Sequence, residues 1–274
     1  MLFLLLSACV PGTDDTSDTG DTVTVRDPVA LSMIAFNVEG LDSTPEGLAE
    51  LVFDEVEGEA IWALSEVPNE SFVQQLAVSA GGDADPFEYV YGTTGGRLHL
   101  ALMWDPSQVE LTEWWELDAL NIAGTARAPL VGAFTTVASD EPFLVVNNHL
   151  WRSEERYRHT QATGLNEWVQ EQTLPAVALG DFNFDWDVPG GEDSHDLGYD
   201  LMTEDGHWTW VVPDELVVTQ CSGFYNSILD FVFVGNAAQQ WGATSIIREQ
   251  QNSYCRDDET RSDHRPVQAD FLIP

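Results

Sequence analysis

The stretch at positions 176–183 reads AVALGDFN and combines a buried strand with a polar end. Its first four residues are apolar without interruption, which is typical of a strand buried on both faces. At Gly180 the apolar run stops, and Asp181 and Asn183 follow. At the rim of a sheet the backbone is held rigidly by the neighbouring strands, and the side chains at the strand end are accessible to a ligand. There we expect Asp181 to accept a proton or face a metal, and Asn183 to donate to a phosphate oxygen. A carboxylate in this position also suits a turn or a helix cap, so this stretch alone does not decide the function.

Other apolar runs of the chain end in the same kinds of residue. The runs predicted as strands cover 30–36, 60–64, 89–91, 98–104, 129–137, 143–146, 176–179, 228–234 and 267–273. The polar residues at their ends, or inside one of them, are Asn37, Glu66, His149, Asp181, Asn183, Asp230, Asp263 and His264. Helices are predicted to begin at Pro45, to cover 70–78, and to run from a cap at Ser153 to roughly residue 172. Residues 184–219 are predicted to be an irregular insertion.

These polar residues are carboxylates, amides and imidazoles, and no serine or cysteine stands in a recognisable nucleophile turn. Carboxylate oxygens suit a hard divalent cation such as Mg2+. Histidines beside them suit proton transfer and the neutralisation of an oxyanion. The set therefore indicates metal-assisted attack of water on phosphorus.

The composition is that of an acidic globular chain. It has 274 residues, a formal net charge of −37 and 47 acidic residues against 10 basic ones, all of them arginines. A surface this negative repels nucleic acid at long range, and added salt screens the repulsion. Two explanations of the negative charge stay open. The protein is adapted to high salt, or it is an acidic secreted protein from a genome that is poor in lysine codons.

The first nine residues, MLFLLLSAC, form an apolar run that ends in small residues and Cys9. The pattern resembles the signal of bacterial lipoproteins, in which lipid is attached to the cysteine, although the usual basic start is missing. Residues 10–29 are rich in Asp and Thr and cannot bury a core, which predicts a disordered tether. We therefore expect a protein of the bacterial cell envelope, bound to the membrane through lipidated Cys9 or secreted. A buried N-terminal strand is the alternative.

Two cysteines remain if Cys9 carries lipid. In an oxidising compartment this even remainder suggests a disulfide between Cys221 and Cys255. Two separate buried thiols are the alternative.

The motifs at the strand ends, in their order along the chain, resemble the endonuclease/exonuclease/phosphatase family of deoxyribonuclease I-like, metal-dependent phosphoesterases. The matching pieces are FNVEGL at 36–41, SEV at 65–67, NHL at 148–150, GDFN at 180–183, LDF at 229–231 and SDHRPV at 262–267. The resemblance covers residues 30–274 and implies one catalytic domain of this family, here in a secreted bacterial lipoprotein. It implies an α/β fold, a four-layer α/β/β/α sandwich in which two mixed β-sheets are flanked by helices.

The resemblance also implies a metal site. Glu66 is expected to bind the metal, Asn37 and Asp263 to lie close to it, and Glu39 to stand where some members carry a second acidic residue. The expected cofactor is Mg2+ or Mn2+.

Catalytic roles follow from the same resemblance. His264, oriented by Asp230, is expected to act as the general base or its equivalent, although family mechanisms disagree on whether the Asp181 position takes this part. Asp181 and Asn183 are expected to handle the attacking water and a phosphate oxygen. His149 is expected to donate to the phosphate in the transition state.

Three features of the chain leave alternatives open. Arg127 begins an Arg-x-Pro piece like that of the family, and it either contacts phosphate or forms a structural ion pair. Some members carry a Tyr and a Glu on the strand that here contains His99, so no partner that would orient His149 is visible. His99 itself either faces the site or is a satisfied strand residue. The insertion holds three tryptophans that either stack on substrate or form its own core: Trp186, Trp208 and Trp210.

Together these patterns predict a Mg2+-dependent phosphoesterase that hydrolyses phosphodiester bonds, above all a cell-surface or secreted nuclease acting on DNA or RNA as a monomer. A phosphomonoesterase or lipid phosphodiesterase of the same family is one alternative. A catalytically inactive surface binding module is another, and the intact set of polar residues argues against it. The arginines after His149 either form a local basic patch or pair with neighbouring acids: Arg152, Arg156 and Arg158.

Overall fold

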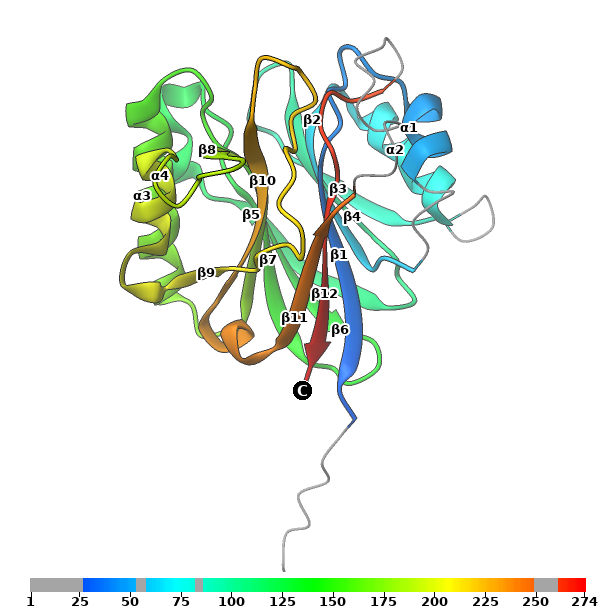
Figure 1. Ribbon diagram of the computed structural model, residues 1–274. Coiled ribbons are helices and arrows are strands. Elements are labelled where there is room, and N and C mark those ends of the chain that lie inside the picture. The colour runs from blue at the N-terminus through cyan, green and yellow to red at the C-terminus, as the bar shows by residue number, and fades with distance from the viewer. Residues whose placement is uncertain (1–26, 53–57, 82–85, 249–260) are drawn as a thin grey trace, which may run out of the picture.

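Two six-stranded sheets stand face to face, and helices cover the outer side of each (Figure 1). The computed structural model describes residues 27–52, 58–81, 86–248 and 261–274. The layered arrangement is the α/β sandwich that the family resemblance implies, so the predicted fold class is confirmed. The expected signal segment, most of the expected tether and Cys255 lie outside the described residues. No helix in the described part of the chain is long and apolar enough to cross a membrane.

The first sheet combines strands from both ends of the described chain. Its strands lie in the order β11–β12–β1–β2–β4–β3, and only β1 and β2 pair in parallel. Their bounds are β1 (Val29–Asn37), β2 (Ile61–Val67), β3 (Glu88–Tyr91), β4 (His99–Trp104), β11 (Gly242–Ile247) and β12 (Val267–Ile273). Helices α1 (Pro45–Val52) and α2 (Glu70–Gly81) lie on its outer side. The predicted helix start at Pro45 is confirmed, and the Thr44 hydroxyl accepts a hydrogen bond from the backbone N–H of Gly47 at 3.1 Å.

The second sheet is built from one continuous part of the chain. Its strands lie in the order β5–β6–β7–β8–β10–β9, and only β7 and β8 pair in parallel. Their bounds are β5 (Val109–Glu116), β6 (Leu130–Thr136), β7 (Pro142–His149), β8 (Ala176–Asp187), β9 (Trp208–Trp210) and β10 (Ser227–Gly235). Helices α3 (Glu155–Glu171) and α4 (Leu197–Thr203) cover its outer side. Short 3-10 turns lie at Asp118–Leu120, Ile122–Gly124, Glu204–Gly206 and Asn236–Gln240.

The core has two parts, and alternate residues of β1 show how a strand serves both. Met33 and Ala35 belong to the apolar cluster that includes the second sheet, whereas Ile34 and Phe36 belong to the cluster under α1 and α2. Successive side chains of a strand point to opposite faces. Because both faces are covered, the strand has no exposed polar alternation and reads as an uninterrupted apolar run.

Strand β8 is longer than the sequence predicts. The predicted end after residue 179 is wrong, because β8 continues through Asp181 and Asn183 to Asp187. The antiparallel partner β10 stays paired with β8 as far as Ser227 and Asp187. The hydrogen bonds of this ladder keep residues 180–187 in the strand although their sequence is no longer uniformly apolar. The parallel partner β7 does stop at this level, with His149 opposite Asp181. Asp181 therefore lies inside a strand but beside a strand end.

The insertion at 184–219 is more regular than predicted, since it contains the end of β8, α4 and β9. Its tryptophans are buried, and the Trp208 indole donates to the Leu165 carbonyl at 3.1 Å. The structure therefore favours the reading of the tryptophans as a local core. The predicted cap at Ser153 is also wrong, because α3 begins at Glu155 and Glu154 holds the N-cap position without a side-chain hydrogen bond.

Candidate active site

Three neighbouring strands of the second sheet place three polar residues side by side. In the ladders of β8, Asp181 lies opposite His149 of β7 and opposite Asp230 of β10. The pairing of β10 with β8 shifts between Ile228 and Asp230, which is the mark of a bulge, and bulges commonly re-aim a side chain next to an active site.

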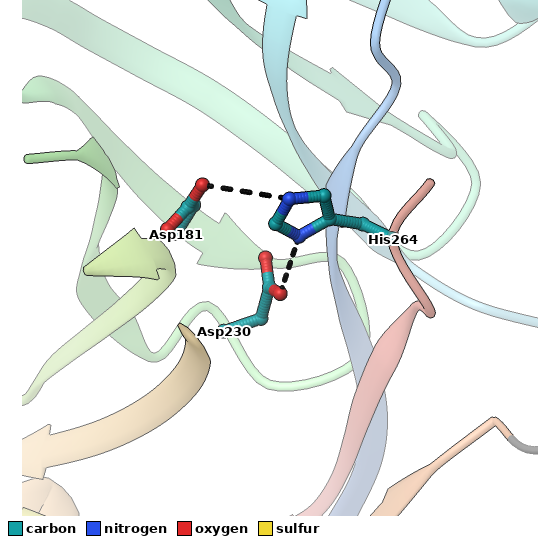
Figure 2. A group of neighbouring side chains, drawn as sticks. All are labelled: Asp181, Asp230 and His264. Carbon is teal, nitrogen blue, oxygen red and sulfur yellow. Dashed lines mark hydrogen bonds and ion pairs between the residues drawn. The ribbon is translucent and has the colours of Figure 1, made fainter. Parts of the chain in front are cut away.

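The first sheet contributes His264, which precedes β12. Its Nδ1 lies 2.7 Å from Asp230 Oδ2, and its Nε2 lies 4.0 Å from Asp181 Oδ2. Figure 2 shows the imidazole between the two carboxylates, with one ring nitrogen facing each. The pairing of His264 with Asp230 expected from the family resemblance is therefore present in the geometry.

Asn37, at the end of β1, links the two sheets through a hydrogen bond to this group. Its Nδ2 donates to Asp181 Oδ2 at 3.1 Å, and its Oδ1 accepts from the Glu39 backbone N–H at 3.1 Å. The other oxygen of Asp181 accepts from the Asn183 backbone N–H at 3.1 Å. Asp181 is 2 % exposed, so these bonds fix the carboxylate in place within the protein interior.

Two further acids of the site have an unusual backbone conformation. Glu39 and Glu66 have positive φ values of 46° and 60°, and Glu66 lies in the shift of register between Leu64 and Val67. A non-glycine residue held in this region costs of the order of 1–3 kcal/mol and persists where the surroundings determine it. Glu39 Oε2 in turn accepts the backbone N–H of Asp263 at 2.8 Å. Glu39 and Asp263 are thus tied together, and Glu66 lines the same pocket.

A pocket of about 440 Å³ opens over these groups. Predicted residues on its wall are Glu39, Glu66, His149, Asp181, Asn183, Asp263 and His264. Asn37, Asp230 and Arg127 do not line it. Asn37 and Asp230 stand behind Asp181 and His264, and Arg127 donates from Nε to the Leu98 carbonyl at 3.0 Å. Within the described residues Arg127 has no carboxylate at ion-pair distance, so the structural ion pair considered for it is absent.

The pocket wall also contains residues that the sequence patterns did not single out: Asp42, Asp185, Gln220 and Tyr225. Gln220 forms an isolated bridge with His264 and donates to Asp263 Oδ2 at 2.6 Å. It precedes β10 by several residues in an irregular stretch, so no periodicity marks it. Only its long-range pairing brings it to the site.

His149 is neutral at ordinary pH. Burial lowers the pKa of His149 well below its usual value, and the charges of Arg127 and His264 lower it further. Its Nε2 lies 3.6 Å from Asp181 and 3.7 Å from Glu66. Its Nδ1 has no hydrogen-bond partner within the described residues, in keeping with the missing orienting partner on β4. Both ring nitrogens of His99 contact backbone carbonyls of its own turn, so His99 is a satisfied strand residue.

The pKa values of His264 and Asp181 are both raised. Burial alone would lower the pKa of His264, but the charge and hydrogen bond of Asp230, with Asp181 and Asp263, raise it to about 10. Burial and the charge of Asp230 raise the pKa of Asp181 to about 7, against the opposing effects of His264 and Asn37. At neutral pH His264 is therefore an imidazolium paired with Asp230, and Asp181 is the group poised to gain or lose a proton.

The donor chemistry of the pocket fits a hard divalent cation. Carboxylates crowd its wall, and of its two arginines Arg158 is already paired with Asp196 at 2.5 Å. Within the described residues, the group of acids and histidines whose ligand atoms all lie within 4.8 Å of one another is Asp181, Asp230 and His264. In that group His264 is hydrogen-bonded to Asp230 at 2.7 Å and lies 4.0 Å from Asp181, an arrangement that suits proton transfer. The oxygens of Glu39, Glu66 and Asp263 are the better metal donors.

The three arginines after His149 separate. Arg152 lines the pocket, and Arg156 lies outside it beside Glu154 at 3.5 Å. Arg158 is buried and donates to Asp196. The local basic patch considered from sequence is therefore reduced to Arg152.

Two facing mixed sheets, with carboxylates, amides and imidazoles gathered in one pocket, define a hydrolase of the metal-dependent phosphoesterase type. A sequence model of the endonuclease/exonuclease/phosphatase family matches residues 34–264, and the chain belongs to this family of phosphoester hydrolases. No curated protein matches the sequence.

Solved structures share the fold. An endonuclease/exonuclease/phosphatase family protein from Bacteroides thetaiotaomicron has a TM-score of 0.69 at 18% identity, over 91% of this chain and 100% of that one. The mannosyl-6-phosphatase of the same organism has a TM-score of 0.61 at 18% identity, over 89% and 100%. TDP2 from D. rerio, complexed with single strand DNA product, has a TM-score of 0.66 at 16% identity, over 89% and 99%. At these identities the likeness shows a common fold.

Proposed function

We propose that this enzyme hydrolyses phosphodiester bonds by metal-assisted attack of water, with Mg2+ or Mn2+ as its cofactor. The observation that carries the proposal is the position of Asp181. It lies 3.6 Å from His149 and 4.0 Å from His264, in a pocket that also holds Glu66 and Asp263. One ionisable carboxylate is thus surrounded by groups that can bind and neutralise a phosphate.

The proton-transfer roles follow from the protonation states. With a pKa near 7, Asp181 suits the role of general base better than His264, whose pKa is raised to about 10. The imidazolium of His264, held by Asp230, stabilises negative charge that develops on the phosphate. Neutral His149 donates its Nε2 proton to a phosphate oxygen when Nδ1 is the unprotonated nitrogen. Asn183 lies on the pocket wall, where its amide can bind another oxygen.

Glu66, Glu39 and Asp263 would hold the metal, which, when bound, would polarise the phosphoryl group and lower the pKa of water. Asn37 supports this set through its bonds to Asp181 and to the backbone of Glu39. We therefore assign Asn37 a positioning role beside the metal.

A nucleic acid is the substrate class that we propose first, with the enzyme acting as a secreted or cell-surface nuclease. It is supported by a relative in fold described with a single strand DNA product, and by Arg152 on the pocket wall. A phosphomonoesterase is the second candidate, because a pocket of about 440 Å³ also accommodates a sugar phosphate and a mannosyl-6-phosphatase shares the fold.

The test is hydrolysis of bis-p-nitrophenyl phosphate against p-nitrophenyl phosphate, with Mg2+ titrated into chelated enzyme. Preference for the diester, lost in His149→Ala and Asp181→Asn, supports the proposal. Preference for the monoester supports the second candidate, and metal-independent or absent turnover contradicts both. Plasmid DNA and RNA at several salt concentrations then decide whether the enzyme is a nuclease.

We also propose a location at the bacterial cell envelope, through lipid on Cys9, and a monomeric state. The pattern of residues 1–9 supports the first. Incorporation of labelled palmitate in cells that express the wild type, but not Cys9→Ser, tests it. Light scattering tests the second.

A further inference from the structure

Arg152 is an unusual cation in an acidic site. Within the described residues it is the arginine of the pocket wall that has no carboxylate at ion-pair distance. Its Nη2 instead donates to the hydroxyl of Tyr225 at 2.8 Å, and its guanidinium carbon lies 5.9 Å from the centre of that ring. Tyr225 lines the same pocket.

Helix α3 holds the backbone of Arg152 in place. Arg158 Nη1 donates to the carbonyls of Trp151 and Arg152 at 2.9 and 2.8 Å. Gln161 Oε1 accepts from the Trp151 backbone N–H at 2.9 Å. Arg158 and Gln161 are buried, so the segment that presents Arg152 is fixed by interior side chains although Arg152 itself is exposed.

Tyr225 is fixed from the other side of the pocket. Its backbone N–H donates to the Ser222 carbonyl at 3.0 Å, and the Ser222 N–H donates to Gln220 Oε1 at 2.6 Å. Gln220 also donates to Asp263, one of the proposed metal ligands. The loop that carries Tyr225 is therefore tied to the reacting end of the pocket.

This pair of residues offers hydrogen-bond donors and no free anion. An arginine has five N–H donors and no acceptor, and one of these donors is used by the Tyr225 oxygen. Since that oxygen accepts from Arg152, its own proton can be donated to a ligand. No other hydrogen bond of the Arg152 guanidinium is present in the described residues. Donors of this kind recognise phosphate or carboxylate.

In the proposed function the scissile phosphate already has its own partners in His149, His264 and Asn183. We propose that Arg152 and Tyr225 form a second anion subsite, which selects substrates that carry another phosphate close to the scissile one. This inference rests on the proposed function and specifies its substrate class. The second phosphate can belong to a nucleic acid, a sugar bisphosphate or a lipid headgroup, and the chemistry of recognition is the same in each.

Matched substrate pairs test the proposal and distinguish these sources. They are dithymidylate with and without a 5′-phosphate, glucose 1,6-bisphosphate and glucose 1-phosphate, and phosphatidylinositol with and without a 4-phosphate. A charge-assisted hydrogen bond to phosphate makes a difference of about tenfold to a hundredfold in affinity. We expect the wild type to prefer the second phosphate by at least about tenfold in kcat/KM in one pair. Arg152→Gln should remove this preference, and Tyr225→Phe should reduce it.

Arg156→Gln is the matched control, because Arg156 lies four residues further on, outside the pocket and beside Glu154. It should keep the preference of the wild type. A wild type without preference in any pair, or a preference that survives Arg152→Gln, overturns the subsite. Turnover of bis-p-nitrophenyl phosphate, which has a single phosphate, tests the proposed function separately.

A binding measurement decides the case even if no ester is turned over. Thymidine 3′,5′-bisphosphate and thymidine 5′-monophosphate are titrated into wild type, Arg152→Gln and Arg156→Gln by calorimetry. The bisphosphate should bind at least about tenfold more tightly, except to Arg152→Gln. Equal affinities for the two nucleotides in the wild type would contradict the subsite.

Discussion

Replacing Asp230 by Asn tests the central pair of the site. Asp230 is 1% exposed, and its Oδ2 holds Nδ1 of His264 at 2.7 Å. The change keeps the size of the side chain and removes its charge. The amide oxygen can still accept a hydrogen bond from Nδ1 of His264, but it is a neutral acceptor and no longer stabilises the charge of an imidazolium.

The expected loss follows from burial. Removing one partner of a buried, hydrogen-bonded charge pair costs about 3–5 kcal/mol. If that cost falls on the transition state, kcat/KM decreases by about 10²–10⁴-fold at roughly 1.4 kcal/mol for each factor of ten. The charge of Asp230 also raises the pKa of both Asp181 and His264. Asp230→Asn should therefore also shift the acid limb of the pH–rate profile to lower pH, which simple misfolding would not do.

The assay is hydrolysis of bis-p-nitrophenyl phosphate by four proteins: wild type, Asp230→Asn, His264→Ala and the double variant. Two residues that act as a unit give single losses of similar size, and the double variant is little worse than either. Asp214→Asn is the control, since Asp214 is exposed and lies outside the pocket. Additive losses in the double variant, or an unchanged acid limb in Asp230→Asn, would refute the assignment.

Three further predictions concern the metal, the pH dependence and the disulfide. Glu66→Gln should reduce turnover by orders of magnitude and weaken Mn2+ binding in calorimetry while circular dichroism stays unchanged; full wild-type activity after exhaustive chelation would contradict the metal site. Because the pKa of Asp181 is raised from 3.8 to about 7, kcat/KM should rise with pH through about 7. The stability that this protonated carboxyl contributes should be lost as the pH rises from about 4 to about 7. An acid limb near pH 4 in the rate profile would argue against Asp181 as the base. A Cys221–Cys255 disulfide, which stays a prediction because Cys255 lies outside the described residues, should contribute about 3–4 kcal/mol, so reduction should lower the melting temperature, and two free thiols in oxidised protein would exclude it.

Much of the fold could be predicted because strands that are buried on both faces are uninterrupted apolar runs in the sequence. Residues 33–36 are all apolar since alternate side chains of β1 enter two different cores. The strands that were missed, β5, β9 and β11, are edge strands of their sheets, and edge strands need bury only part of their surface. The end of β8 was misplaced for a related reason, because its ladder with β10 continues where its apolar pattern does not.

The site was predictable only as a set of residue types. Asp181 and His149 follow apolar runs, and Asp230 lies within one, so the sequence places them at strand ends or within a strand. It does not show that the three strands are neighbours, or that Asp230 keeps His264 protonated at neutral pH against the opposing effect of burial. Gln220 and Tyr225 carry no local signal, because the loop between them reaches the pocket through pairing with His264 and Asp263.

The division of the chain between the two sheets has a consequence for biosynthesis. The second sheet is a continuous segment, whereas the first is closed by β12 inserted between β11 and β1. His264 and Asp263 come shortly before β12; their partner Asp230 lies in β10 of the second sheet, and Glu39 follows β1 of the first. A nascent chain still on the ribosome can thus pair β5 to β10 but has no complete pocket until the last strand is released and docks. A chain truncated before Ser262 would lack Asp263, His264 and β12, and with them the complete pocket.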